Sequence, residues 1–298
     1  MAEQNLNGLG VALVTPFHKD KSIDYESLAG LIDHVIEGGC DYIVALGTTA
    51  ETPTLTTEEK IILTDYIREQ NSGRVPLVIG IGGNNTKGLC EELKSRDLTG
   101  YSAVLSVTPY YNKPTQEGLY AHYSALAESS PLPILLYNVP GRTGVNMTAR
   151  TTLRLAEAGG DKFCGIKEAS GNLEQVREIL ASAPEGFKVM SGDDSLTCRF
   201  MRLGANGVIS VLANAYPAQV RRLVSLGEAE CHKDAEQLQQ DLQEFTDLLF
   251  VDGNPAGIKC ALSQIGLIEN ELRLPLVRVS EHVATRMKEA STILGDLI

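Results

Sequence analysis

The feature that most constrains the fold of this chain is a repeated pair of segments, a short apolar run followed by an amphipathic stretch. The first apolar run covers residues 10–17, and in the stretch after it apolar residues recur at helical spacing up to a Gly-Gly pair: Leu28, Leu31, Ile32, Val35 and Ile36. Further apolar runs predict strands at 41–49, 76–83, 101–111, 133–140, 163–170, 188–194 and 207–214. No hairpin turn signals separate these strands, so the pattern predicts a parallel sheet with crossover helices.

Eight evenly used units favour a closed α/β architecture, the (β/α)8 or TIM barrel. An open doubly wound sheet is the alternative, but no GxGxxG motif follows the first strand. We therefore expect residues 1–225 to form the barrel. The remaining residues, 226–298, contain two helical patterns, at 233–250 and 280–297, and predict a C-terminal helical domain packed on the barrel.

Composition limits the partners and the compartment. The formal net charge of -12 opposes binding to nucleic acid or to an anionic membrane surface. The N-terminus lacks a basic segment followed by an apolar one, and no apolar run is long enough to span a bilayer. The cysteines are dispersed without metal-site spacing, which predicts reduced thiols in a cytoplasmic protein: Cys40, Cys90, Cys164, Cys198, Cys231 and Cys260.

One lysine, Lys167, interrupts the apolar run FCGIKEAS at 163–170. Most lysines are solvated surface groups. In the sixth strand of a barrel, however, Lys167 points either into the barrel or toward the helices. Burial disfavours a lysine ammonium and favours the amine, which is a nucleophile for carbonyl groups. We predict that Lys167 forms a Schiff base, and the alternative is a structural ion pair with Glu168 or another acid.

Other polar residues follow other predicted strands, and in such a barrel these strand ends share one face. Tyr111 and Tyr137 are either core aromatics or parts of a proton relay. Arg142 is either a surface loop residue or a partner for a substrate carboxylate. The GTTAE segment at 47–51 offers hydroxyls and N–H groups for a carboxylate, although Gly-Thr-Thr is common in turns. No GxSxG, HExxH or metal-spaced cluster is present, so no metal or cofactor is expected.

Six segments in this order closely resemble the dihydrodipicolinate synthase family, within the N-acetylneuraminate lyase superfamily of class I aldolases: GTTAE, TPYYNKP, YNVPGRTG, GIKEASGN, SGDDS and GVISV. The resemblance covers essentially the whole chain. It implies a lyase that condenses pyruvate with L-aspartate 4-semialdehyde, the first committed step of diaminopimelate and lysine biosynthesis, with no metal or organic cofactor. It also implies a homotetramer built as a dimer of dimers.

The resemblance assigns four catalytic residues. Lys167 would form an imine with pyruvate, and Tyr137 would be the general acid and base beside it. Thr48 and Tyr111 would extend a hydroxyl relay from Tyr137 toward solvent. In this family the tyrosine that matches Tyr111 comes from a neighbouring subunit.

Four further residues would bind substrate. Thr49 would hold the carboxylate of pyruvate together with Thr48, and Arg142 would hold the carboxylate of the semialdehyde. Ile209 and Gly192 would line the pyruvate pocket. Another pyruvate-dependent aldolase, such as N-acetylneuraminate lyase or a 2-keto-3-deoxy sugar acid aldolase, is the alternative within the superfamily, and Arg142 disfavours it. A non-catalytic binding protein on the same fold is the other alternative.

The sequence departs from the family pattern in two places. Ala50 replaces the glycine of the usual GTTGE segment, and such a change can alter backbone angles beside Thr49. In lysine-inhibited relatives the allosteric pocket uses two histidines and a glutamate, whereas Thr57, Lys60 and Gly88 occupy these positions here beside a retained asparagine and tyrosine, Asn84 and Tyr110. A pocket with a cation and no acid predicts weak or absent feedback by lysine.

Overall fold

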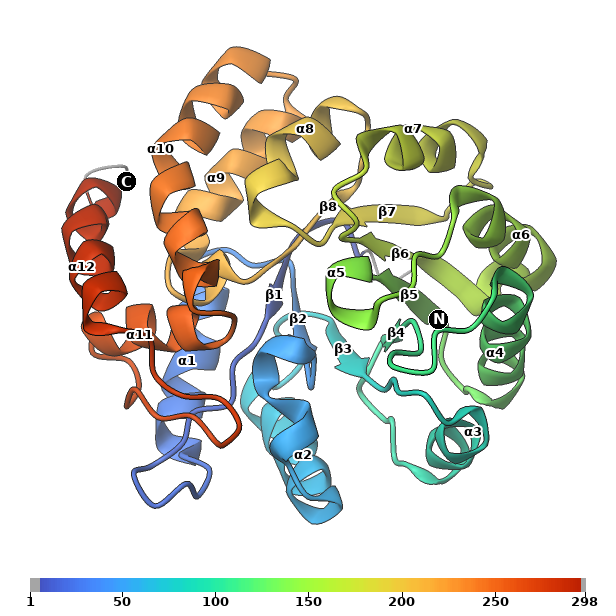
Figure 1. Cartoon of the computed structure of the whole chain (residues 1–298), viewed down its shortest axis with the longest axis horizontal. Helices are drawn as coiled ribbons and strands as arrows, with labels where there is room; N and C mark the ends of the chain where they lie inside the picture. Colours follow the sequence, from blue (N-terminus) through green and yellow to red (C-terminus); the bar gives the residue numbers. More distant parts are fainter. Residues whose placement is uncertain (1–5, 296–298) are drawn as a thin grey trace.

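A computed structural model describes residues 6–295 of this chain, with side chains to residue 292, and it contains a closed barrel of eight parallel strands (Figure 1). Each strand pairs with its neighbours in sequence order, and β1 pairs with β8 to close the ring. The strands are β1 Gly8–Ala12, β2 Tyr42–Ala45, β3 Leu77–Gly80, β4 Ala103–Val107, β5 Ile134–Asn138, β6 Phe163–Glu168, β7 Lys188–Ser191 and β8 Gly207–Ser210. The predicted (β/α)8 barrel is therefore confirmed. The first five residues of the N-terminal stretch and the last three of the expected helical domain lie outside the described residues.

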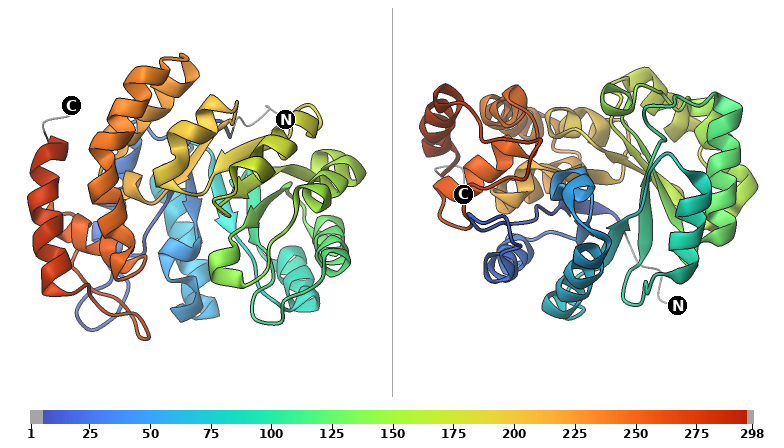
Figure 2. Two further views of the ribbon diagram at one scale, coloured as in Figure 1. Left: turned by 45° about the horizontal axis from the view of Figure 1, so that its top comes forward. Right: turned by 60° about the horizontal axis from the view of Figure 1, so that its bottom comes forward.

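Helices surround the barrel on the outside (Figures 1 and 2). Six of the nine, α1 to α4, α6 and α7, begin at a residue whose side chain accepts from a free backbone N–H group, as in α2, where Thr56 and Glu59 form a reciprocal capping box. The helices are α1 Tyr25–Glu37, α2 Thr57–Asn71, α3 Thr86–Ser95, α4 Gln116–Ser129, the short α5 Pro140–Thr143, α6 Ala149–Gly159, α7 Leu173–Ser182, α8 Thr197–Arg202 and α9 Pro217–Glu228.

The strands separate two apolar cores, because successive side chains of a strand point to opposite faces. The inner core fills the barrel with side chains such as Val44, Leu135 and Met190. The outer core lies between strands and helices and includes Ile166 of β6. Since Ile166 faces outward, the next residue, Lys167, faces into the barrel.

Three more helices follow the barrel: α10 His232–Val251, α11 Ala256–Gln264 and α12 Glu281–Gly295. They lie together on one side of the barrel (Figure 1), and α10 packs against α8, α9 and α12. The division expected between residues 225 and 226 falls inside α9, which is the helix that follows the eighth strand. We propose that the C-terminal helical domain begins after α9, at the turn that follows Glu228.

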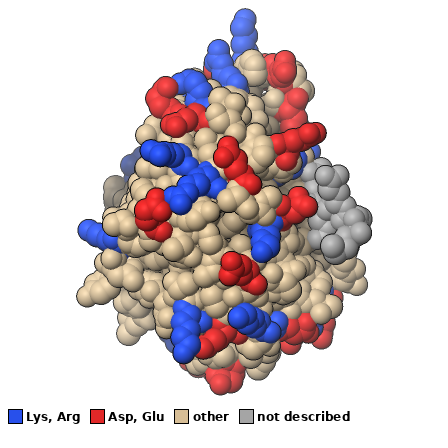
Figure 3. All heavy atoms as spheres, turned by 90° about the vertical axis from the view of Figure 1, so that its right-hand side faces the viewer, with Lys and Arg blue, Asp and Glu red and all other residues tan. Residues whose placement is uncertain are grey.

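The surface carries both signs of charge side by side. On the face shown in Figure 3, lysines and arginines alternate with acidic side chains. Arg154 of α6 forms an ion pair with Glu117 of α4, at 2.6 Å. All six cysteines are free in the structure. None of the helices within residues 6–295 combines the length and the apolar character that a membrane span requires.

The pairing of β1 with β8, which we call the seam of the barrel, contains a position where an added methyl group should destabilise the fold. Gly207 has φ +144°, and a Cβ there would lie 1.9 Å from the carbonyl oxygen of its partner, Gly8. We expect Gly207→Ala to lower the free energy of unfolding by about 3 kcal/mol, through overpacking and backbone strain. Gly30→Ala, in open space on α1, should raise it by roughly 0.5–1 kcal/mol. Urea unfolding of both variants measures the two signs, and an unchanged midpoint for Gly207→Ala would contradict this account of the seam.

Candidate active site

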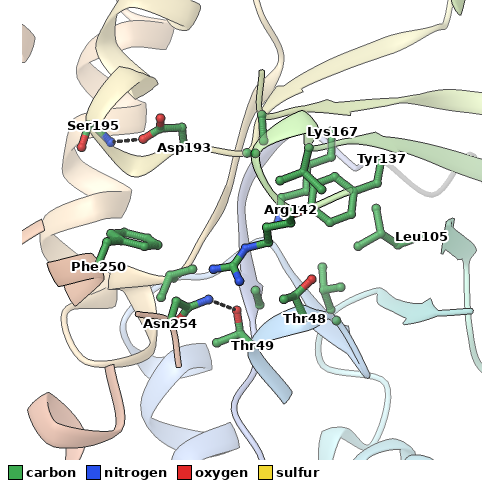
Figure 4. A pocket seen from close by; sticks show the side chains of 18 of the residues that line it. Thr48, Thr49, Leu105, Tyr137, Arg142, Lys167, Asp193, Ser195, Phe250 and Asn254 are labelled. Carbon is green, nitrogen blue, oxygen red and sulfur yellow. Dashed lines mark hydrogen bonds between the residues drawn. The ribbon is translucent and has the colours of Figure 1, made fainter. Parts of the chain in front are cut away.

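A cavity of about 570 Å³ opens at the carboxyl ends of the strands and brings together six of the eight predicted site residues (Figure 4). These six are Thr48, Thr49, Tyr137, Arg142, Lys167 and Gly192. They come from the ends of β2, β5, β6 and β7 and from the short helix α5. Residues up to about 145 positions apart in the sequence thus meet because parallel strands in a closed barrel all end at one rim.

Lys167 is inside the barrel and only 5% exposed. It pairs with Tyr137 across β5 and β6, and its Nζ lies 4.6 Å from the centre of the Tyr137 ring. Gly192 provides the space for this side chain, since a Cβ there would lie 3.0 Å from Lys167 Cε and 2.7 Å from the Cβ of Ala169. The Lys167 side chain therefore lies between the ring of Tyr137 and the backbone of Gly192, which has no side chain to obstruct it.

The ion pair between Lys167 and Glu168 is not found. Glu168 is fully buried on the opposite face of β6, where its carboxylate accepts hydrogen bonds from Asn138 and Gln175, both at 3.0 Å, and from the N–H of Ser170 at 2.6 Å. Within residues 6–295, no carboxylate lies within ion-pair distance of the Lys167 amine. The lysine thus has no structural charge partner and remains directed into the cavity.

The segment that carries the two threonines is a tight 3-10 turn, Thr48–Ala50, which we call the threonine turn. Its peptide groups are fixed from two sides: Thr15 Oγ1 donates to the carbonyl of Ala50 at 2.8 Å, and Thr52 Oγ1 donates to the carbonyl of Gly47 at 2.9 Å. Ala50 is buried and lies within the turn without a positive φ. The turn therefore accommodates alanine in place of glycine.

Arg142 follows Pro140 in α5, and its guanidinium points into the cavity toward Thr49 and Asn254 (Figure 4). Two carboxyl groups, Asp193 and Asp247, line the same cavity. Burial raises the pKa of Asp193, and the nearby charge of Asp247 adds to that shift. The mouth of the barrel therefore offers the guanidinium of Arg142 and two acidic groups to a ligand.

Two predicted site residues do not line this cavity. Ile209 is 1% exposed and packs in the inner core of the barrel. Tyr111 is 89% exposed in the loop after β4, with a left-handed backbone at φ +70° that is uncommon for an aromatic residue. The neighbouring Tyr110 lines a second cavity of about 360 Å³ together with Lys60, and this cavity shares Tyr137 with the first.

The C-terminal helices also contribute to the cavity, which the sequence did not indicate. Phe250 and Val251 at the end of α10 and Asn254 in the following turn line it, and Asn254 Nδ2 donates to Thr49 Oγ1 at 3.1 Å. The local signal is weak: an Asn-Pro pair after a helical pattern marks a turn and nothing more. The position of Phe250, Val251 and Asn254 beside the barrel depends on how α10 packs, and no short sequence motif encodes that packing.

One group of side chains among the described residues has the atoms of a metal site. A nitrogen of His18 and carboxylate oxygens of Asp24 and Glu269 lie within 4.8 Å of one another. None of the three lines the cavity, and the oxygens of Asp24 already accept hydrogen bonds from Ser27 at the start of α1. Among the described residues that line the cavity, no comparable group of ligands is found.

Comparisons with known proteins agree with this geometry. A family model described as the dihydrodipicolinate synthetase family matches residues 5–293. The 4-hydroxy-tetrahydrodipicolinate synthase of Parabacteroides distasonis is 53% identical over 93% of both chains, and that of Phocaeicola vulgatus is 51% identical over 100% of this chain and 99% of its own. The crystal structure of dihydrodipicolinate synthase from Thermotoga maritima superposes with a TM-score of 0.94 at 38% identity, covering 99% of this chain and 100% of that one.

The space beside Lys167 predicts a sensitive position. Gly192→Ala would push a methyl group against Lys167 Cε, so we expect it to slow the reaction of the amine with a carbonyl compound about tenfold. Gly141→Ala, which adds a methyl to open space in the same cavity, should leave the reaction unchanged. Reductive trapping of Lys167 in both folded variants provides the measurement, and equal rates would contradict the assignment of Gly192.

Proposed function

We infer the function from the premise that this chain belongs to the dihydrodipicolinate synthetase family: it is a 4-hydroxy-tetrahydrodipicolinate synthase, a lyase of the Schiff-base type. It condenses pyruvate with L-aspartate 4-semialdehyde. The observation that carries this inference is the buried Lys167 amine, which has no ion-pair partner among the described residues and faces a cavity that also contains Tyr137 and Arg142.

The first steps that we propose build an imine. The Lys167 amine attacks the carbonyl carbon of pyruvate, and a C–N bond forms while the carbonyl oxygen takes a proton. Tyr137, whose ring centre lies 4.6 Å from the amine, supplies that proton, and loss of water leaves a protonated imine. The threonine turn holds the substrate carboxylate through the hydroxyl and N–H groups of Thr48 and Thr49.

The next steps form the product. The protonated imine withdraws electrons, so a methyl proton passes to the phenolate left on Tyr137 and an enamine forms. The enamine carbon attacks the aldehyde carbon of the second substrate, the aldehyde oxygen takes that proton from Tyr137 to become a hydroxyl, and the protonated imine is restored. The ammonium of that substrate then loses one proton to Tyr137, and the resulting amine attacks the imine carbon, which closes the ring and returns the amine of Lys167.

The charges at the mouth favour this second substrate over the alternatives. Arg142 can hold its carboxylate in a bidentate manner, and Asp193 and Asp247 suit the ammonium that the same molecule carries on entry. Sugar-acid aldolases act on a partner without that ammonium. A cavity with both signs of charge thus supports L-aspartate 4-semialdehyde rather than a sugar.

Tyr111 suggests how the relay extends beyond one chain. We propose that its exposed ring reaches the site of a neighbouring copy, within a homotetramer, and completes the relay that begins at Tyr137 and Thr48. Exposure of 89% combined with a strained backbone is unusual for a tyrosine without a function. The role of Ile209 as a pocket residue remains a prediction. The cytoplasmic location also remains a prediction, and the six free thiols support it.

The decisive experiment is to trap the imine. Wild-type protein treated with pyruvate and borohydride should gain one reduced pyruvate per chain, located on Lys167 by mass spectrometry of peptides. Lys167→Ala should gain none, whereas Lys162→Ala, which removes the lysine that precedes the same strand, should label normally. A label on another lysine would refute the mechanism, and turnover of N-acetylneuraminate instead of aspartate semialdehyde would refute the substrate.

Regulation provides a separate prediction. Lys60 and Arg96 line the second cavity, its acidic residue Glu92 is already paired with Arg96 at 2.7 Å, and no acidic side chain stands at position 88. The ammonium of free lysine should therefore be repelled there. We expect micromolar lysine to leave the condensation rate unchanged. A steady-state assay with lysine as the added ligand tests this, and inhibition at micromolar lysine would overturn it.

A further inference from the structure

A second lysine, Lys259 of α11, is more deeply buried than Lys167. Its side chain is fully buried and pairs with the carboxylate of Glu51, which is also fully buried. Lys259 Nζ donates to the carbonyl of Glu271 at 2.9 Å and lies 4.1 Å from the centre of the Phe17 ring. Burial lowers the pKa of Lys259 to about 8, and the Glu51 carboxylate opposes that shift. The ammonium therefore persists at neutral pH.

Glu51 is the last residue of the GTTAE segment and follows the threonine turn directly. Its N–H donates to the carbonyl of Thr48 at 3.2 Å, and its backbone is left-handed, with φ +55°. A left-handed backbone in a residue other than glycine persists only when its surroundings impose it. The ion pair with Lys259 is an interaction that can impose it, because it fixes the end of the Glu51 side chain on the C-terminal domain.

Two other contacts fasten the same region to the C-terminal domain. The N–H of Arg273 donates to the second carboxylate oxygen of Glu51 at 2.9 Å. Asn254, which lies in the turn before α11, donates a hydrogen bond to the hydroxyl of Thr49 at 3.1 Å. The threonine turn is thus connected to the C-terminal domain at both its middle and its end.

A purely stabilising role is the simpler interpretation of the pair. Buried ion pairs, however, give little net stability compared with apolar side chains of similar size, because both charges lose their hydration. An ion pair differs from an apolar contact in fixing the position of the charged groups. Here the ion pair fixes the position of Glu51, the residue that directly follows the threonine turn.

We propose that Lys259 is a positioning residue for the threonine turn, holding it through Glu51 in the geometry that binds the carboxylate of pyruvate. The proposal rests on the proposed function of the cavity. Without the charge of Lys259, the carboxylate of Glu51 would be buried without its cation and would move toward water, and the turn would move with it. A displacement of this kind weakens binding at the turn while the Lys167 amine stays in place.

The test measures the pyruvate concentration that half-saturates borohydride trapping at Lys167, together with the melting temperature. In Lys259→Met we expect the half-saturating concentration to rise about tenfold and the melting temperature to fall. Ile179→Ala, which opens a cavity under α7 away from the site, should lower the melting temperature and leave half-saturation unchanged.

The double variant Glu51→Gln/Lys259→Met separates position from stability. Removing both charges should restore much of the melting temperature, because no unpaired charge remains buried, while half-saturation stays raised. Recovery of both quantities in the double variant, or a raised half-saturation in Ile179→Ala, would overturn the proposal. If the wild type itself traps no pyruvate at Lys167, the proposed function fails instead.

Discussion

Closure of eight parallel strands directs every second side chain into a space that the chain itself must fill. Apolar residues fill most of it here, from Val44 to Met190, and Lys167 occupies one of these inward positions near the rim. The same closure at the Gly8 and Gly207 seam places all strand ends on one rim. The chemistry of the site depends on this geometry, because it gives a lysine an apolar surrounding and an open cavity at once.

The C-terminal helices complete that site. They supply a wall of the cavity through Phe250 and Asn254, and they hold the threonine turn through Glu51 and Asn254. Arg273 extends the connection, since its guanidinium binds Glu59 of α2 at 2.6 Å and the carbonyl of Thr54 at 3.0 Å. The loop after β2 is therefore held between the barrel and the added helices, and neither part forms the cavity alone.

Much of this arrangement could be predicted from the sequence, because the apolar pattern of each strand is a local property and repeated strand-helix units favour a closed barrel. All eight strands lie within the predicted runs apart from the first two residues of β1, and six predicted site residues meet at the cavity. Asn254 and Phe250 could not be predicted, since their place depends on how α10 packs against the barrel. The orientation of Glu51 away from the cavity could not be predicted either, because it depends on the left-handed backbone of Glu51 itself.

The comparison of the two buried lysines explains why sequence alone could not separate their roles. Lys259 stands in the apolar segment AGIKCALSQ much as Lys167 stands in FCGIKEAS, so the criterion that indicates one indicates the other. The structure separates them by their partners. Lys259 pairs with a carboxylate and a carbonyl in a closed space, where its proton is held and its lone pair is inaccessible. Lys167 has an aromatic ring beside it and a cavity before it, so its amine can reach a carbonyl carbon. A buried lysine can act as a nucleophile only where no carboxylate pairs with it and where a cavity leaves room for a substrate.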